Sequence, residues 1–415
     1  MDTTRTDSYL SDTTSTDSVR ERKDNRASKY LTGDWGGARC ELEDAGLSLR
    51  LFYNQQYQQN FRGGLETHNG HRLSGSYDFQ IALDLEKMGL LEGGSFFIET
   101  KGHWSDGINP SKVGALFNVN DDAIGDHPVF INKWWYRQTF AGEKIDLRLG
   151  VLETTKDLID VSPYAYDEDK NFFNALSIHN AAIPHRIGMG ASLKIQPVDW
   201  WYLQIAAIDA QSRPRRTRFD TGFHGRALFL GFAEVGFTPQ WQSAKGPMPG
   251  RYRVGGWYDP RPKTVFRNTL DGRRRTRQRG DDVGFYVGFD QLVWKENDDP
   301  KDTQGLGIYA RYGHAHGDVN RVSDYWSAGM SWQGLFPTRD QDVLGLGVSQ
   351  AILSSRFRRE VHEQADRETV YELYCAIHLS PWLIISPDLQ VITNPGGDKD
   401  DRDAIVGGIR VRVIF

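Results

Sequence analysis

The sequence predicts an all-β protein, a sixteen-stranded antiparallel transmembrane β-barrel with a short N-terminal helix. Three observations predict it: period-two segments recur along the chain, their connections alternate in length, and the final segment ends on an aromatic residue. In that segment Ile409 and Val411 alternate with Arg410 and Arg412 before Phe415. A strand that is apolar on one face and charged on the other is typical of a barrel with lipid outside and water inside.

Composition agrees with a barrel. The chain has 415 residues with 43 Gly, 12 Trp and 17 Tyr, yet its mean hydropathy is only -0.56. A membrane-spanning helix needs roughly 20 consecutive apolar residues, and the sequence contains no such run. The net charge of -5 gives no reason to expect a nucleic-acid partner. Cys40 and Cys375 fit no disulfide, metal or nucleophile pattern, and no cofactor is expected.

Sixteen segments alternate with period two, each near the roughly 9–11 residues that a tilted strand needs to cross a bilayer. They are 48–58, 76–86, 94–104, 129–140, 144–151, 188–195, 199–208, 226–237, 251–258, 282–293, 304–313, 323–333, 342–351, 370–380, 382–393 and 404–415.

The connections between these segments are alternately long and short, beginning with the long 59–75 and the short 87–93. Outer-membrane barrels have short periplasmic turns and longer external loops. The alternation therefore predicts both termini in the periplasm. The contrast is weakest at 238–250, which is long for a turn, and at 314–322, which is short for a loop.

The sequence predicts three parts of the chain. Residues 1–30 are rich in Thr, Ser, Asp and Arg and are expected to be a disordered tail. Residues 31–47 are expected to form a periplasmic helical plug, with a helix capped by Asp34 and ended by Gly46. The barrel is expected over 48–415. No apolar signal core begins the sequence, so we infer that the signal was removed from an outer-membrane protein.

The segment Thr32-Gly-Asp-Trp-Gly-Gly-Ala-Arg39, followed by Glu41-Leu-Glu-Asp-Ala-Gly46, resembles the opening of the carbohydrate-selective porins of the OprB family. Weaker likenesses follow in the family's order: Trp134–Gln138, Leu147–Gly150, Asn171–Asn174 before Ile183-Pro184, and Asn394–Phe415. The resemblance covers about residues 31–415. It implies a sixteen-stranded barrel that passes sugars across the outer membrane by diffusion. The Arg-rich insert at 259–281 and the Thr/Ser-rich tail depart from the family.

A sugar channel needs a constriction of charged and hydrogen-bonding side chains together with aromatic rings. Strand parity gives inward candidates, and parity on 129–140 is resolved by the roughly 2–4 kcal/mol cost of a midplane Arg or Lys facing lipid. The candidates are Arg50, Asp78, Glu99, Lys101, Lys133, Trp135, Arg137, Asp146 and Arg148, with Asn118 and Asn120 from the loop 105–128. The alternative is that several of these only pair with one another on the wall.

Two long loops, 105–128 and 152–187, could fold into the lumen, and for the second an external cap stays open. The pattern Asn118-x-Asn120-x-Asp122 lacks the glycine and glutamate of a calcium loop, so a solvated acidic loop is expected. The clusters Arg213–Arg218 and Arg273–Arg277 are expected on external loops, either solvated or bound to lipopolysaccharide phosphates.

The leading functional hypothesis is a passive carbohydrate porin that accepts mono- or oligosaccharides. A general or anion-preferring porin is the alternative, because inward arginines are numerous. A barrel enzyme is disfavoured, since no Ser and His converge at a strand end. The expected partners besides sugars are outer-membrane lipid and the barrel assembly machinery, which would recognise Phe415, with lipopolysaccharide as a further candidate.

Overall fold

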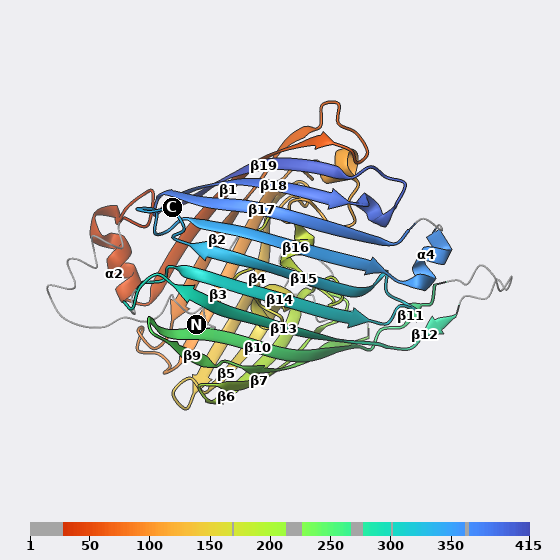
Figure 1. The fold of residues 1–415 in the computed structure, drawn as a ribbon. Helices are drawn as coiled ribbons and strands as arrows, with labels where there is room; N and C mark the ends of the chain where they lie inside the picture. The colour runs from red at the N-terminus through yellow and green to blue at the C-terminus, as the bar shows by residue number, and fades with distance from the viewer. Residues whose placement is uncertain (1–27, 168–169, 213–225, 267–276, 300–301, 362–364) are drawn as a thin grey trace.

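The computed structural model describes residues 28–167, 170–212, 226–266, 277–299, 302–361 and 365–415. Sixteen strands form one antiparallel barrel, which closes because β1 pairs with β2 on one side and with β19 on the other. Figure 1 shows the closed sheet. The strands are β1 Leu47–Arg62, β2 His71–Asp84, β3 Gly94–Trp104, β4 His127–Phe140, β5 Ile145–Glu153, β6 Ile187–Val198, β7 Trp201–Asp209, β8 Phe229–Phe237, β10 Gly246–Asp259, β13 Asp282–Lys295, β14 Gly305–Ala315, β15 Val322–Gln333, β16 Val343–Leu353, β17 Arg367–Ser380, β18 Leu383–Thr393 and β19 Ala404–Ile414.

The predicted sixteen-stranded barrel is therefore confirmed. Three further strands lie outside the count. β9 Gln240–Ser243 pairs with the start of β10, which explains why the connection at 238–250 is long for a turn. β11 Lys263–Thr264 pairs with β12 Gln278–Arg279 in a short hairpin between β10 and β13. A helix, α4 Ser355–Val361, lies between β16 and β17.

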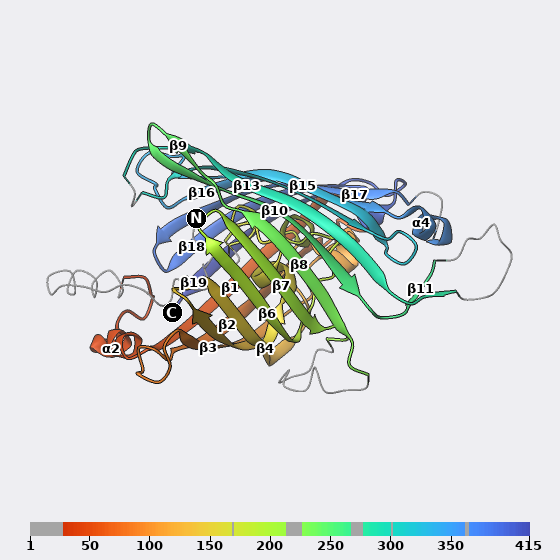
Figure 2. The ribbon, with the colours of Figure 1, turned by 90° about the horizontal axis from the view of Figure 1, so that it is seen from below.

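The barrel has two distinct ends. The short connections and the C-terminus lie at one end, with the N-terminal helix, and we call this the turn end. The hairpin β11–β12 and α4 lie at the other, the loop end (Figure 1). Figure 2 shows the strands running obliquely between the two ends. The Arg213–Arg218 cluster and all of the Arg273–Arg277 run except Arg277 lie outside the described residues, as does the tail 1–27. Within the described residues, no helix is long and apolar enough to cross a membrane.

The N-terminal segment folds as a 3₁₀ turn, η1 Trp35–Gly37, followed by α2 Ala38–Asp44. The Asp34 carboxylate accepts a hydrogen bond from the Cys40 amide at 3.0 Å, so it caps the first turn. Gly46 ends the segment with φ +93°, and a Cβ there would lie 2.6 Å from the Asp84 carbonyl oxygen. Only glycine fits at position 46 without strain, and Asp34 supplies the acceptor that the first turn of the helix needs.

This segment packs on the closing strand. The Leu31 amide donates to the Ile414 carbonyl at 2.8 Å, and Arg39 donates to a terminal oxygen of Phe415 at 3.3 Å. The sequence assigned Tyr30 to a disordered tail, and for this residue the assignment is wrong. Tyr30 is buried because Arg39 covers its ring, 3.7 Å from the centroid.

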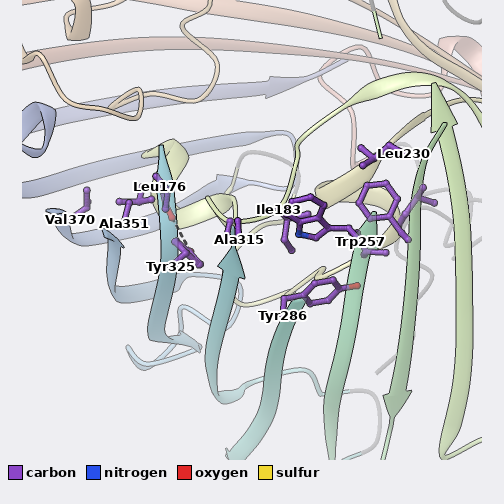
Figure 3. Packing of buried hydrophobic residues seen from close by; sticks show 14 of the residues in the cluster. Leu176, Ile183, Leu230, Trp257, Tyr286, Ala315, Tyr325, Ala351 and Val370 are labelled. Carbon is purple, nitrogen blue, oxygen red and sulfur yellow. Dashed lines mark hydrogen bonds between the residues drawn. The ribbon is translucent and has the colours of Figure 1, made fainter. Parts of the chain in front are cut away.

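The connections 105–126 and 154–186 both fold into the lumen, so the second is not an external cap. They contain the short helices η2 Asn109–Val113, η3 Thr154–Leu158 and α3 Ala175–Ile178. Apolar side chains of these loops pack on inward-facing residues of the strands, forming a core inside the barrel. Figure 3 shows part of this core, with Leu176 and Ile183 beside the strand residues Tyr325, Ala315 and Trp257.

We expect damage to the closing strand to reduce the amount of folded barrel. β19 pairs with β1 from Phe52–Ile414 to Asn60–Val406, and Val411 faces lipid opposite Gln55. A Lys that faces lipid costs roughly 2–4 kcal/mol at the midplane and less towards the interfaces, so Val411→Lys should lower the heat-modifiable fraction on gels. Deleting Phe415 removes the hydrogen bond that its amide donates to the Leu51 carbonyl, and it should lower the folded fraction in the same way. Normal assembly of both variants would contradict the role of this strand.

Candidate functional site

The loop 154–186 is fixed to the far wall of the barrel by buried charges. Arg253 on β10 contacts Asp160 of the loop at 3.1 Å and also pairs with Asp290 on β13. Glu372 on β17 accepts hydrogen bonds from the amides of Phe173 and Asn174. A buried carboxylate or guanidinium is stable only when it is paired, so these contacts define the path of the loop.

Glycines on β14 and β16, in the same wall of the barrel, make room for the aromatic side chains of this loop. A Cβ at Gly307 would overlap the ring of Tyr164, and one at Gly347 would lie 2.7 Å from Cζ of Phe172. Phe172 packs edge-on against Tyr374, with 4.9 Å between ring centroids. The glycine-rich inner faces of β14 and β16 therefore receive the loop.

The loop 105–126 is held against β1, β2 and β17. Asp122 accepts a hydrogen bond from Ser76 at 2.6 Å, and Glu368 accepts one from the Leu116 amide at 2.6 Å. The Asn120 side chain donates to Ser74 at 3.1 Å, and Asn118 donates to the Ala123 carbonyl at 2.6 Å. The expectation of a solvated acidic loop at 118–122 is wrong, because Asn120 and Asp122 are buried and bonded to the wall.

The two loops also contact each other. Asp121 pairs with Lys156 at 2.7 Å and with His179 at 3.1 Å. Burial alone would raise the pKa of Asp121, but the charges of Lys156 and His179 hold it well below its usual range. Lys156 also lies over the ring of Tyr166, 4.7 Å from its centroid. The paired loops cross the lumen as one layer.

Between these loops and the turn end lies a cavity of about 700 Å³. Among the described residues, eight basic and seven acidic side chains line it, together with Phe52, Phe97, Tyr164 and Tyr166. Six of the residues singled out from the sequence are in this lining: Asp78, Glu99, Lys101, Lys133, Asp146 and Arg148. A nearly balanced set of charges with aromatic rings can bind a polar, uncharged solute.

Most of these charges are paired across neighbouring strands or with the inner loop. Lys101 contacts Asp78 at 3.2 Å, and Lys133 contacts Asp157 of the loop at 2.8 Å. Glu99 accepts hydrogen bonds from Asn132 at 2.7 Å and Gln80 at 2.9 Å. The alternative in which inward charges pair on the wall thus describes part of the arrangement, although the same side chains still line the cavity.

A second group centres on Asp146. It contacts Arg137 at 3.0 Å and Arg148 at 3.1 Å. Arg148 lies 5.3 Å from the Trp135 ring centroid, and Trp135 stacks on Phe97 at 5.1 Å. Trp135 and Arg137 are buried and do not line the cavity, but Trp135 contacts Arg148 and Phe97, and Arg137 contacts Asp146.

Arg50, Asn118 and Asn120 also do not line this cavity. The sequence reasoning did not single out Phe52, Lys156, Asp157 or Arg251, all of which do. Phe52 and Arg251 carry the inward parity of their strands, which was an available signal. Lys156 and Asp157 carried no such signal, because their position depends on the path of the loop.

A closed sixteen-stranded barrel with a polar cavity and two inward-folded loops has the architecture of a porin. The chain belongs to the carbohydrate-selective porin OprB family, whose family model matches residues 68–415. Family and barrel together imply a location in the outer membrane.

Individual relatives agree. The chain is similar to Porin B of Pseudomonas aeruginosa, with 24% identity over 94% of this chain and 92% of that protein. It is also similar to the putative porin QuiX of Acinetobacter baylyi, with 20% identity over 93% of each. Among solved structures, the high-pH structure of Pseudomonas putida OprB matches with a TM-score of 0.78 and 21% identity, covering 94% of this chain and 99% of that one. This structural likeness shows the fold.

Proposed function

We propose that this porin allows passive diffusion of carbohydrates through a charged, aromatic-lined constriction formed in the lumen beside the inner loops. The observation that carries the proposal is the lining of the turn-end cavity, where acidic and basic side chains are nearly equal in number and Phe52, Phe97, Tyr164 and Tyr166 are interspersed. Carboxylates accept and guanidinium or ammonium groups donate, so vicinal sugar hydroxyls find both partners. Aromatic rings offer apolar area for the C–H faces of a pyranose.

Within this proposal the residues have graded roles. Asp78, Glu99, Lys101, Lys133, Asp146 and Arg148 contact the solute from the wall. Trp135 and Arg137 position Arg148 and Asp146. Asn118 and Asn120 set the position of the loop 105–126, and Arg50 contributes to the field of the lumen.

A general or anion-preferring porin is the second candidate. Inward arginines such as Arg251 and Arg412 favour it. The balance of eight basic against seven acidic lining residues argues against a strong anion preference in this cavity.

We expect liposomes containing the purified full chain to swell in isotonic glucose, because neutral polyols can exchange water for the paired charges of the lining at little cost. Swelling rates should fall with solute size as the solute approaches the width of the constriction. Chloride and potassium should carry comparable current in planar bilayers. Failure to swell in any neutral sugar, with strong anion selectivity, would favour the second candidate.

We place the turn end in the periplasm, with the residues 31–47 as a periplasmic plug segment and Phe415 available to the barrel assembly machinery. In this orientation the loop end meets lipopolysaccharide. The short turns, the helix α2 and the C-terminus lie together at this end, which supports the orientation (Figure 1). In a Cys40→Ser, Cys375→Ser background, intact cells should label a cysteine at Asp400 but not one at Lys144, both of which are exposed. The reverse labelling would contradict this orientation.

A further inference from the structure

A second cavity, of about 340 Å³, lies at the loop end, on the other side of the two inner loops. Residues 116–117, 181–184 and 186 of those loops form one part of its lining, and the ends of β10, β14 and β15 with the chain beside them form the rest. Its charge differs from that of the turn-end cavity. Among the described residues, four basic side chains and no acidic side chain line it: Arg186, Arg261, Lys263 and Arg321.

Two of these cations pair with carboxylates that do not line the cavity. Arg261 contacts Asp259 at 2.6 Å, and Lys263 contacts Asp282 at 2.6 Å. Arg186 and Arg321 form no ion pair in the described part of the chain, although the more distant Asp259 and Glu368 partly offset their charges. The Arg186 side chain donates a hydrogen bond to the His185 carbonyl, and Arg321 lies over the ring of Phe357, 5.3 Å from the centroid. The cavity therefore has a surplus of positive charge.

Hydrogen-bond donors in the lining also lack acceptors. Trp257 is 4% exposed, and its indole nitrogen is buried without a partner among the described residues. The Nε atom of Arg186 is also buried without a hydrogen-bond partner among the described residues. Figure 3 shows Trp257 beside Ile183, another residue of the lining. Buried donors without acceptors are unfavourable, and a ligand rich in acceptor oxygens would satisfy them.

The surroundings of Arg186 point the same way. Burial and the neighbouring Arg261 guanidinium both lower the pKa of Arg186, while Asp259 partly opposes them. Cations that repel each other across a cavity are stabilised by an anion placed between them. Phe117, Ile183 and Pro184 supply apolar walls in the same cavity. A small inorganic anion would leave these walls uncovered.

We propose that the loop-end cavity is a binding subsite for a carboxylate-bearing monosaccharide of the uronic-acid type. Arg186 and Arg321 bind the carboxylate, because the planar guanidinium matches its two oxygens. The Trp257 N–H donates to a sugar oxygen, and the apolar walls cover the C–H face. The volume lies near the lower end of the roughly 300–1,000 Å³ of small-molecule pockets, which suits one sugar unit. The inference rests on the proposed sugar porin and adds a substrate class to it.

The test compares glucuronate with glucose in planar bilayers containing the full chain, each added to one side at a time. In the wild-type chain, glucuronate added from one side should bind about ten-fold more tightly than glucose, as expected for charged hydrogen bonds at a partly exposed site. The double variant Arg186→Gln, Arg321→Gln should lose this difference. Arg356→Gln is the matched control, because Arg356 lies at the same end but pairs with Asp318 at 3.0 Å outside the cavity. It should keep the preference.

The outcomes separate the two proposals. A wild-type chain that passes glucose but binds glucuronate and glucose equally overturns the subsite and leaves the sugar porin standing. A wild-type chain that passes no neutral sugar contradicts the proposed sugar porin, on which the subsite rests. Inorganic phosphate that competes as well as glucuronate, with the same loss in the double variant, overturns the assignment to a sugar. A preference that survives in the double variant, with heat-modifiability showing a folded barrel, removes Arg186 and Arg321 from the site.

Discussion

Arg253→Met is expected to raise the single-channel conductance and weaken sugar block, because it releases the loop 154–186 from the wall. Arg253 is buried and joins Asp160 of the loop to Asp290 of the barrel. Removing one member of a buried charge network costs about 3–5 kcal/mol, since its partners are left buried and unpaired. The loop should then leave its place across the lumen for part of the time, and current noise should increase together with mean conductance.

Two further variants make the test specific. Arg339→Met changes a half-buried arginine that pairs with Asp342 at 2.7 Å in a turn-end connection, and its conductance should match wild type. Asp160→Asn keeps the Arg253–Asp290 pair and weakens only the contact between Arg253 and the loop. This variant replaces Arg253→Met if that protein does not assemble. Unchanged conductance in a folded Asp160→Asn barrel would show that other contacts, such as those of Arg311 with the Ser177 and Ile178 carbonyls, hold the loop.

The barrel was predictable because lipid imposes a strict pattern on every strand. Most residues that face lipid are apolar, and their neighbours along the strand face the lumen, so period two recurs wherever the chain crosses. Val411 and Arg412 on β19 illustrate this: the first is opposite Gln55 on the outer face, and the second is buried inside. The alternation of connection lengths predicted which connections lie together at each end of the barrel.

The inner loops were harder to predict, because the lumen is not uniformly polar. At the loop end the inward faces carry apolar residues such as Ile208, Leu230 and Val406, which pack against the loops. From sequence alone these residues look like weak interruptions of a polar face. Glycines on the inner faces of the strands could not be interpreted from sequence either. Gly307 and Gly347 are explained only once Tyr164 and Phe172 are known to lie against them.

In the candidate site, too, the residues on strands were predictable and the residues on the inner loop were not. Parity brought Asp78, Glu99 and Lys101 to the inner face, where they line the turn-end cavity, while their part in sugar passage stays a prediction. Parity says nothing about depth, so it could not separate Arg50, which lies off the cavity, from Arg148, which lines it. Lys156 and Asp157 required the three-dimensional path of the loop.

Arg148→Ala is expected to weaken sugar block of the ion current roughly ten-fold and to reduce any anion preference. Arg148 contacts Asp146 at 3.1 Å and lies over the Trp135 ring, so its guanidinium is fixed where it can donate to a passing hydroxyl. A hydrogen bond to a charged group is worth about 1.5–3 kcal/mol when desolvated and less where water replaces it. The lower part of that range corresponds to the expected change.

Arg50→Ala provides the comparison, because Arg50 shares the inward face but does not line the cavity. Its effect on sugar block should be several-fold smaller, while its effect on ion selectivity, which depends on the longer-ranged field of the lumen, should be similar. Lys144→Ala, at an exposed turn, should change neither quantity. Equal loss of sugar block in Arg50→Ala and Arg148→Ala would mean that the narrow point is nearer to Arg50 than the cavity indicates. Unchanged block and selectivity in both would remove the wall charges from the constriction and leave the loop residues Lys156, Asp157 and Tyr166 as its determinants.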